Sequence, residues 1–315
     1  MHVLGIDVGG SKTICLLADE QGQVVASARD EGANLQGVGE LALEKVLHTV
    51  MDKTIAERHV RPAAICLGIA GVDRAADEAV VRSIMKRIGY QARILVVNDA
   101  LIALQAGLGD GPGIVIVSGT GSIAYGRNNK GEAARAGGWG YVLGDEGSGY
   151  WIGRLALRAV VRHADGRGRP TELTPKLLGH FHAERAADLI HRIYHEELGP
   201  RAIASLAHHV QQARDDGDPV AIAILNHAAD ELITAATAVM SSLDLREDAF
   251  TFVLSGGMFH AVPWLCDQLK LLLPSLARRS TTLRLETEPA MGAVQLAIAE
   301  LHGGASVPAY RPNIT

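Results

Sequence analysis

Two short glycine-rich turns carry residue types that bind phosphate. The first, Gly9-Gly10-Ser11-Lys12-Thr13, follows Asp7, and the second, Gly119-Thr120-Gly121-Ser122, follows Ser118. Glycines let backbone N–H groups approach phosphate oxygens, the hydroxyls and Lys12 add donors, and Asp7 can hold Mg²⁺ through water. Two such turns that face each other would hold a polyphosphate from both sides. A plain hairpin turn is the alternative for either motif alone, and neither fits the Walker A pattern.

A carboxylate lies between these turns in the sequence, where an apolar strand gives way to a helix. Asn98-Asp99 follows the apolar pair Val96-Val97. Ligands bind at the carboxyl ends of the strands of an open sheet, so Asp99 is a candidate general base. The alternative is that Asp99 only caps the helix, because Asp is a favoured N-cap residue.

Acids, glycines and aromatic residues are combined in the segment 137–151, which has the sequence GGWGYVLGDEGSGYW. Carboxylates such as Asp145 accept hydrogen bonds from hydroxyl groups, glycines such as Gly138 free backbone amides, and indole rings pack on sugar C–H faces. This composition suits a polyhydroxylated ligand. Farther along, Ser255-Gly256-Gly257 predicts a strand-to-helix turn that could pass beneath the adenosine of a nucleotide, with a simple turn as the alternative.

The composition of the 315 residues excludes several classes of protein. With 30 basic and 35 acidic residues the net charge is −5, which gives no basic footprint for duplex nucleic acid. No apolar run approaches the ~20 residues of a membrane span. Cys15, Cys66 and Cys266 form neither a disulfide framework nor a Cys-x-x-Cys metal site, which favours a cytoplasmic location. The histidines lack a His-Glu-x-x-His zinc motif and are interpreted as surface residues.

The elements that must position these residues follow the same plan in two halves. The first half opens with three predicted strands joined by glycine-bearing turns, and helices then alternate with strands. The predicted elements are strands 3–7, 13–18 and 24–29, helix 41–58, strand 63–69, helix 75–88, strand 93–98 and helix 100–108. The glycine-rich stretch 108–113 is the predicted boundary between the halves.

The second half opens with the same three-strand meander. Its predicted elements are strands 114–118, 122–127 and one from residue 132, helices 150–163, 183–195, 202–215 and 219–243, strand 249–254, helix 259–273, strand 282–285 and helix 289–301. Two such halves predict a duplicated α/β architecture, with a ligand cleft between an N-terminal lobe, 1–112, and a larger C-terminal lobe, 113–301. Helix 289–301 is a candidate to pack back on the N-terminal lobe, and the tail 302–315 is expected to be frayed.

As an ordered set, these motifs resemble the N-acetylglucosamine kinase family, within the BadF/BadG/BcrA/BcrD-type ATPases of the sugar kinase, heat-shock ATPase and actin superfamily. The resemblance runs from Gly5 to Gly292, and segment 137–148 is its most specific motif. It implies a two-lobed, duplicated ribonuclease H-like fold, the actin-like ATPase fold, with ATP and Mg²⁺ in the cleft. It also implies phosphorylation of the 6-hydroxyl of an aminosugar, N-acetylglucosamine or glucosamine, by a protein that forms a homodimer.

The resemblance assigns roles to individual residues. Asp99 falls where the family has its base, and Asp7 falls where it has the acid that organises the metal through water. The nucleotide positions are Gly9, Gly10, Ser11, Lys12, Thr13, Gly119, Thr120, Gly121, Gly256 and Gly257, and the substrate positions are Asn34, Asn98, Asp99, Ser122, Gly138 and Asp145. This set is coherent, because phosphoryl transfer needs positioning and charge neutralisation. Ile123 replaces an Asn of the animal members and removes an amide expected near the sugar, so glucose and related aminosugars are further candidates.

Two alternatives belong to other functional classes. ATPases that activate benzoyl-CoA reductases resemble this chain in the phosphate turns, but they carry cysteines for an iron–sulfur cluster between subunits. Cys15 and Cys66 lie in predicted strands and Cys266 lies in a predicted helix, which disfavours that function. A sugar-sensing regulator that lacks activity is disfavoured by the complete acid set of Asp7, Asp99 and Asp145.

Overall fold

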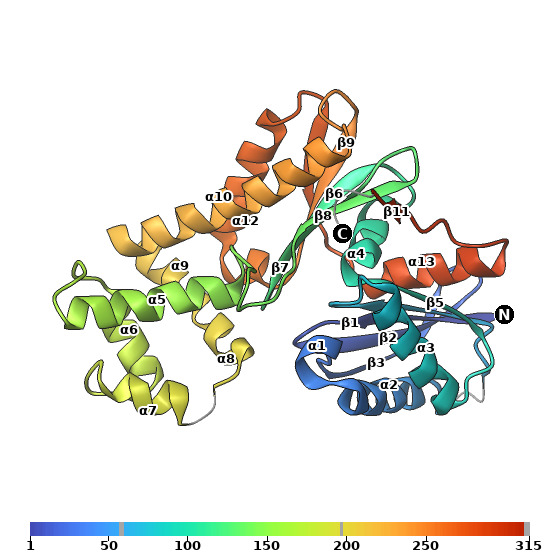
Figure 1. The fold of residues 1–315 in the computed structure, drawn as a ribbon, viewed down its shortest axis with the longest axis horizontal. Helices are drawn as coiled ribbons and strands as arrows, with labels where there is room; N and C mark the ends of the chain where they lie inside the picture. The colour runs from blue at the N-terminus through green and yellow to red at the C-terminus, as the bar shows by residue number, and fades with distance from the viewer. Residues whose placement is uncertain (57–59, 196–197, 312–315) are drawn as a thin grey trace.

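Each half of the chain contains one mixed sheet, and the two sheets are built on the same plan (Figure 1). The computed structural model describes residues 1–56, 60–195 and 198–311. The first sheet has the strand order β3-β2-β1-β4-β5 and the second has the order β10-β9-β6-β7-β8-β11. In both, an antiparallel three-strand meander is extended by two parallel strands on the far side of its first strand. This repetition confirms the duplicated α/β fold that the sequence predicts.

The first sheet is covered on both faces, and its central strands are therefore continuous apolar runs. Its strands are β1 (His2–Val8), β2 (Lys12–Asp19), β3 (Val24–Glu31), β4 (Ala64–Ile69) and β5 (Arg93–Asn98). Alternate residues of β1 point to opposite faces, so Leu4 and Ile6 belong to one core while Val3 belongs to another.

The second sheet repeats the arrangement and adds a short strand from the C-terminus. Its strands are β6 (Gly113–Ser118), β7 (Ser122–Arg127), β8 (Glu132–Gly137), β9 (Phe250–Ser255), β10 (Ser280–Arg284) and β11 (Ala309–Tyr310). The pairing of Ser118 with Ser122 closes the β6–β7 hairpin, as the pairing of Val8 with Thr13 closes the β1–β2 hairpin. The two glycine-rich turns therefore occupy equivalent places in the two sheets.

Helices cover the outer faces of both sheets, and two further helices lie between the sheets. The helices of the first half are α1 (Leu35–Val38), α2 (Glu40–Ile55), α3 (Ala75–Ile88) and α4 (Asp99–Leu108). In the second half they are α5 (Gly149–Ala164), α6 (Leu173–His180), α7 (Asp188–Tyr194), α8 (Pro200–Ser205), α9 (Ala207–Asp215), α10 (Pro219–Ser242), α11 (Met258–Ala261), α12 (Pro263–Leu272), a 3₁₀ turn (Leu273–Ser275) and α13 (Ala290–Leu301). None of these helices, in the ranges given, is long and apolar enough to cross a membrane.

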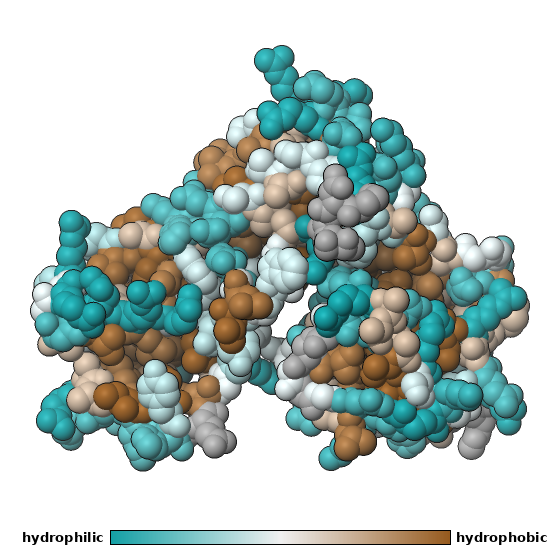
Figure 2. All heavy atoms as spheres, viewed as in Figure 1, coloured by the Kyte–Doolittle hydropathy of each residue, from teal (hydrophilic) through white to brown (hydrophobic). Residues whose placement is uncertain are grey.

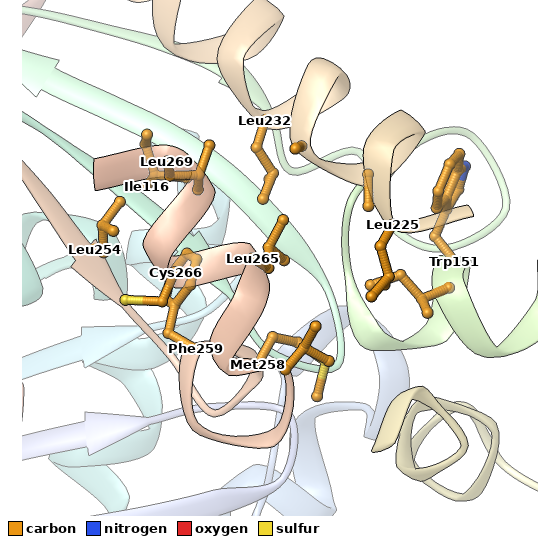
Figure 3. Packing of buried hydrophobic residues seen from close by; sticks show 14 of the residues in the cluster. Ile116, Trp151, Leu225, Leu232, Leu254, Met258, Phe259, Leu265, Cys266 and Leu269 are labelled. Carbon is orange, nitrogen blue, oxygen red and sulfur yellow. The ribbon is translucent and has the colours of Figure 1, made fainter. Parts of the chain in front are cut away.

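The core of the second half joins the second sheet to this body of helices. Figure 3 shows Ile116 of β6 and Leu254 of β9 packed near Phe259, Cys266 and Leu269 of α11 and α12. The same cluster continues through α10 to Trp151 of α5. This continuous apolar core fixes the start of α5, which follows segment 137–148, relative to the sheet that carries the second glycine-rich turn.

Helices α4 and α13 fill the space between the two sheets. Their apolar residues share one core with the inner faces of both sheets, from Val3 and Ala64 in the first to Val115 and Val253 in the second. The approach is close because glycines stand at the contacts. A Cβ on Gly5 of β1 would lie 2.5 Å from the backbone nitrogen of Val294, and a Cβ on Gly292 would lie 1.9 Å from the carbonyl oxygen of Ile102.

Three predicted helices of the second half differ from those observed. Helix 183–195 begins only at Asp188, whose carboxylate accepts hydrogen bonds from the backbone nitrogens of Glu184 and Arg185 and so holds a turn there. The prediction 202–215 is divided into α8 and α9, which meet at Leu206. The prediction 259–273 is interrupted before Pro263, which has no N–H to continue a helix. Helices α1 and α6 were not predicted, and the end of predicted helix 41–58 lies outside the described residues.

The C-terminal tail is ordered where the sequence predicts fraying. Ala309 and Tyr310 form β11, which pairs in parallel with β8, and the Arg311 guanidinium contacts the carboxylates of Glu132 and Asp244. These partners are 67 or more residues away in the sequence, so local composition does not reveal them. Residues 312–315 lie outside the described residues.

The close contact at Gly292 predicts that a larger residue there lowers the free energy of unfolding. In Gly292→Ala the new methyl group would overlap the Ile102 carbonyl oxygen, and the free energy of unfolding is expected to fall by about 2 kcal/mol, measured by urea denaturation. Gly179→Ala in α6 is the matched control, because a Cβ there would meet no described atom within 4 Å. Equal effects of the two substitutions would contradict this account of the packing.

Candidate active site

The two glycine-rich turns meet between the lobes, although 109 residues separate Ser11 from Thr120. The Ser11 Oγ and Thr120 Oγ1 atoms are 2.7 Å apart. Each turn is held tight by a backbone hydrogen bond, from Gly9 N to the Lys12 carbonyl in the first and from Gly119 N to the Gly121 carbonyl in the second. A space-filling view shows a deep hollow between the two lobes (Figure 2). The structure therefore brings together the two motifs that the sequence predicted to face each other.

The second turn is fixed by its neighbours. The carbonyls of Gly119 and Thr120 accept hydrogen bonds from the first backbone N–H groups of α5, those of Gly149 and Tyr150. Gly256 has φ +115°, and a Cβ there would lie 2.2 Å from the Ser118 carbonyl oxygen. Gly256 thus lets the turn after β9 lie directly against the end of β6, whereas a Cβ on Gly257 would meet no described atom within 4 Å.

Three predicted phosphate or sugar contacts are already engaged within the protein. Thr13 is fully buried and its hydroxyl donates to the Glu31 carbonyl at 2.8 Å, so it ties β2 to β3 rather than facing the turn. The Ser122 hydroxyl donates to the Glu146 carbonyl at 2.7 Å and anchors segment 137–148. Lys12 does reach the surface of the first turn, where its Nζ lies 2.7 Å from a carboxylate oxygen of Glu288. Both hydroxyls support the fold in this structure, and the predicted roles of Thr13 at the nucleotide and of Ser122 at the sugar remain predictions.

Two carboxylates lie at the edge of the first sheet where β1 and β5 end. Asp7 is the next-to-last residue of β1 and is buried, and Asp99 follows β5 at the start of α4 and is half-buried. Burial, with the Asp99 carboxylate as the second cause, raises the pKa of Asp7 to about 7. Burial, with the Asp73 carboxylate as the second cause, raises the pKa of Asp99 to about 7 as well. The edge therefore concentrates negative charge that the protein neutralises only in part.

Asn98, rather than Asp99, caps α4. The Asn98 side-chain oxygen accepts a hydrogen bond from the Ala100 backbone nitrogen at 2.7 Å, and its side-chain nitrogen donates to Asp73 at 2.8 Å. The alternative in which Asp99 is only a cap is therefore wrong. Both ends of the Asn98 amide are engaged and the residue is buried, and its predicted contact with sugar remains a prediction.

Segment 137–148 folds over the second turn with Asp145 at its base. Asp145 has φ +60°, is buried, and accepts a hydrogen bond from Gly140 N at 3.2 Å. Burial raises the pKa of Asp145 to about 6, against the lowering by its backbone hydrogen bonds. Gly121 leaves room for Asp145, since a Cβ there would lie 2.6 Å from the carboxylate. Ile123 packs close to the segment at Gly138, where an added Cβ would lie 2.8 Å from the Ile123 side chain.

Asn34 lies next to the first turn. The preceding residue, Ala33, donates its backbone N–H to the Gly9 carbonyl at 3.1 Å, and a Cβ on Gly32 would lie 2.4 Å from the carbonyl of Gly10. The segment that carries Asn34 is therefore packed on the phosphate turn. Its predicted role at a sugar hydroxyl remains a prediction.

Two residues of this region, Asp73 and Glu288, have no place in the sequence-based set. Asp73 follows β4 and contacts Asn98, Arg135 and the hydroxyl of Tyr310. An acid just beyond the carboxyl end of a buried strand was a usable signal for Asp73. Glu288, by contrast, reaches Lys12 from 276 residues away, and no local pattern marks it.

Comparisons with known proteins agree with this geometry. The family model described as the BadF/BadG/BcrA/BcrD ATPase family matches residues 4–297. An N-acetylmuramic acid/N-acetylglucosamine kinase from Clostridium acetobutylicum is 34% identical over 302 residues, which cover 95% of this chain and 99% of that protein. An N-acetyl-D-glucosamine kinase from Dictyostelium discoideum is 33% identical over 311 residues, covering 94% of this chain and 97% of that protein.

A solved structure gives the same result for the fold. The protein named "Putative N-acetylglucosamine Kinase from Chromobacterium violaceum" superposes with a TM-score of 0.74 at 27% identity, covering 93% of this chain and 97% of its own. The fold is thus the two-lobed actin-like ATPase fold of the sugar kinases. Because the family model spans nearly the whole chain and two relatives exceed 30% identity over more than nine-tenths of it, the chain belongs to the BadF/BadG/BcrA/BcrD ATPase family.

Proposed function

We propose that the protein is an ATP-dependent kinase that phosphorylates the 6-hydroxyl of an aminosugar, N-acetylglucosamine or glucosamine. The observation that carries this proposal is the 2.7 Å contact between Ser11 Oγ and Thr120 Oγ1, which joins two phosphate-type turns beside the acids Asp7 and Asp99. The substrate class is supported by two relatives, both named as kinases of N-acetylglucosamine.

The phosphates of ATP would lie between the two turns. Gly10 and Gly119 leave open space beside their α-carbons, since a Cβ on either would meet no described atom within 4 Å. Ser11 and Thr120 now satisfy each other, and a phosphate oxygen entering between them could accept from both hydroxyls. Lys12 would exchange the Glu288 carboxylate for phosphate. Gly9 and Gly121 hold the turns, and Gly256 and Gly257 would pass beneath the adenosine.

Asp99 would act as the general base. The sugar 6-oxygen bonds to the γ-phosphorus, the bond between that phosphorus and the β–γ bridging oxygen breaks to release ADP, and the hydroxyl proton passes to the Asp99 carboxylate. Burial raises the pKa of Asp99 to about 7, and a base is most effective when its pKa lies near the working pH. Asn98 is the residue that caps the helix, so the cap does not depend on the Asp99 carboxylate.

The donor set at the first sheet suits a magnesium ion held through water. Asp7 is buried, and the charges of Asp99 and Glu288 both favour its protonated form, while Lys12 alone opposes them. Such an excess of carboxylate is what a hydrated divalent cation neutralises. When bound, Mg²⁺ would offset the charge of the transferring phosphoryl group. Within the described ranges, no three His, Cys, Asp or Glu side chains are close enough to hold a metal ion by themselves.

The sugar would lie between Asn34 and segment 137–148. The Asp145 carboxylate would offer an acceptor to sugar hydroxyls, and the Gly138 N–H holds the start of the segment by donating to the Ser122 carbonyl. Trp139, Val142 and Leu143 of the same segment are 60%, 78% and 78% exposed. Closure of the lobes on the sugar would cover these side chains and exclude water from the phosphoryl group.

The activator of benzoyl-CoA reductases remains the second candidate, and the cysteines argue against it. Cys15, Cys66 and Cys266 are all buried and unpaired in the described chain. None offers an exposed thiolate for a cluster shared between subunits. Three free thiols are also typical of a reducing compartment, which supports the cytoplasmic location. The homodimer is proposed from the family resemblance alone.

The proposed function predicts which sugars accept phosphate from ATP. We expect ATP-dependent ADP release, with a sugar phosphate detected by mass, on N-acetylglucosamine or glucosamine within a panel that also holds N-acetylmuramic acid, N-acetylmannosamine and glucose. The 6-deoxy analogue of the active sugar should bind and compete but accept no phosphate. Phosphate transfer to that analogue would contradict the assignment of the 6-hydroxyl, and silence on every sugar would favour the activator function.

The proposed base predicts opposite effects of Asp99→Asn on rate and stability. Turnover is expected to fall by about 10³-fold, while the affinity for ATP stays within about threefold. An unfolded chain ionises this group near 3.8, whereas burial raises the pKa of Asp99 in the folded protein to about 7. The ionised carboxylate therefore destabilises the folded state above pH 7, and the substitution should raise Tm at pH 8.

The same linkage fixes how that gain depends on pH. The gain in Tm should shrink as pH falls from 7 towards 4, because the folded wild-type carboxyl is then protonated. Asp216→Asn is the matched control, since Asp216 is 57% exposed in a surface pair with Lys176. Unchanged turnover in Asp99→Asn would remove this residue from the role of base.

A further inference from the structure

Asp73 joins the two lobes at a point next to the proposed base. Its side chain is only 13% exposed and lies in the loop between β4 and α3. One carboxylate oxygen accepts hydrogen bonds from the Asn98 side-chain nitrogen at 2.8 Å and from the Tyr310 hydroxyl at 2.9 Å. The other lies 3.7 Å from the Arg135 guanidinium. Asn98 belongs to the first lobe, whereas Tyr310 and Arg135 belong to the second.

On the first lobe, Asp73 determines how α4 begins. The Asn98 amide bridges two partners, because its nitrogen donates to Asp73 and its oxygen caps α4 at the Ala100 N–H. Asp99 stands between Asn98 and Ala100 in the chain, so the same cap holds its backbone. Loss of the Asp73 acceptor would leave a buried amide unsatisfied and release the cap.

On the second lobe, the partners of Asp73 lie on two strands, Arg135 on β8 and Tyr310 on β11. Arg135 of β8 lies beneath segment 137–148 and stacks its guanidinium over the Trp139 ring, 4.7 Å from the centroid. Tyr310 of β11 packs edge-on against Tyr125 of β7, with ring centroids 6.0 Å apart. Both side chains extend from the second sheet to a carboxylate of the first lobe. Asp73 is therefore a shared contact of the sugar segment, the C-terminal strand and the cap of the base-bearing helix.

We propose that Asp73 is a positioning residue. It contacts the second lobe at Arg135 and Tyr310 and the first lobe at Asn98, and it thereby couples the position of the second lobe to that of Asp99. This inference rests on the proposed function for the identity of the base. A shift of about 1 Å in a reacting group can cost about 100-fold in rate, so a small movement of the cap is sufficient to matter. The neighbouring charge of Asp73 also raises the pKa of Asp99, after burial as the larger cause.

Substitutions that preserve shape test the coupling. Tyr310→Phe keeps the ring on Tyr125 and removes only the hydroxyl, and we expect kcat to fall about fivefold with KM for the sugar nearly unchanged. Asp73→Ala should lower kcat by about 10- to 100-fold, and Asp73→Asn, which retains a hydrogen-bond acceptor, should recover part of that loss. Tyr310→Phe added to Asp73→Ala should have no further effect, because the two residues act through one contact.

Matched controls and a readout independent of activity complete the test. Tyr194→Phe, at a side chain 76% exposed, and Asp216→Asn should leave kcat unchanged. Backbone hydrogen exchange at the start of α4, including the Ala100 N–H, should be faster in Asp73→Ala and in Tyr310→Phe than in the wild type and the controls.

The outcomes separate this inference from the proposed function. Faster exchange with a lower kcat supports the coupling, and faster exchange in a protein that phosphorylates no sugar supports the link to α4 while overturning the proposed function. Exchange unchanged in both variants overturns the coupling, as does an additive loss of kcat in the double variant. Where Asp73→Ala does not fold, Tyr310→Phe alone decides, because its packing is preserved.

Discussion

The site depends on how closely α4 and α13 pack between the two sheets. Gly5 and Gly292 allow backbone to lie against backbone there, and the shared apolar core draws from both sheets. Because the sheets repeat one plan, bringing them together in this way places the two equivalent hairpin turns against each other. The contact between Ser11 and Thr120 is the direct result. A larger residue at either glycine would separate the sheets and, with them, the two halves of the proposed phosphate site.

The charges at this junction are arranged for a ligand rather than for stability. Burial and neighbouring carboxylates raise the pKa values of Asp7 and Asp99, and Lys12 forms an ion pair with Glu288. A protein that gained only stability from this region would pair or remove such acids. In the proposed function a phosphate would pair with Lys12 and a hydrated cation would neutralise the acids. The free-energy cost of burying these acids would then serve catalytic preorganisation.

The sequence predicted the parts of the structure that local patterns encode. Period-two apolar runs and glycine turns gave the meanders, and the α/β alternation gave helix α3 and strand β5 at their observed bounds. Residue chemistry also identified the turns and the acids that the fold brings together. Local patterns did not reveal the contacts that engage three of the predicted site residues, most of which come from 18 or more residues away. Thr13 and Ser122 have the right hydroxyls, but Glu31 and Glu146 carbonyls take them. Asn98 has a sugar-binding amide, but Asp73 and Ala100 engage it.

The central claim is that the two turns hold one triphosphate between them with the sugar 6-hydroxyl at Asp99. A crystal structure with a non-hydrolysable ATP analogue, Mg²⁺ and the accepted aminosugar tests it most directly. We expect phosphate oxygens within hydrogen-bond distance of Ser11 and Thr120, Lys12 released from Glu288, and the 6-hydroxyl in contact with the Asp99 carboxylate. A nucleotide bound to only one turn, or a sugar whose 6-hydroxyl faces away from Asp99, would contradict it.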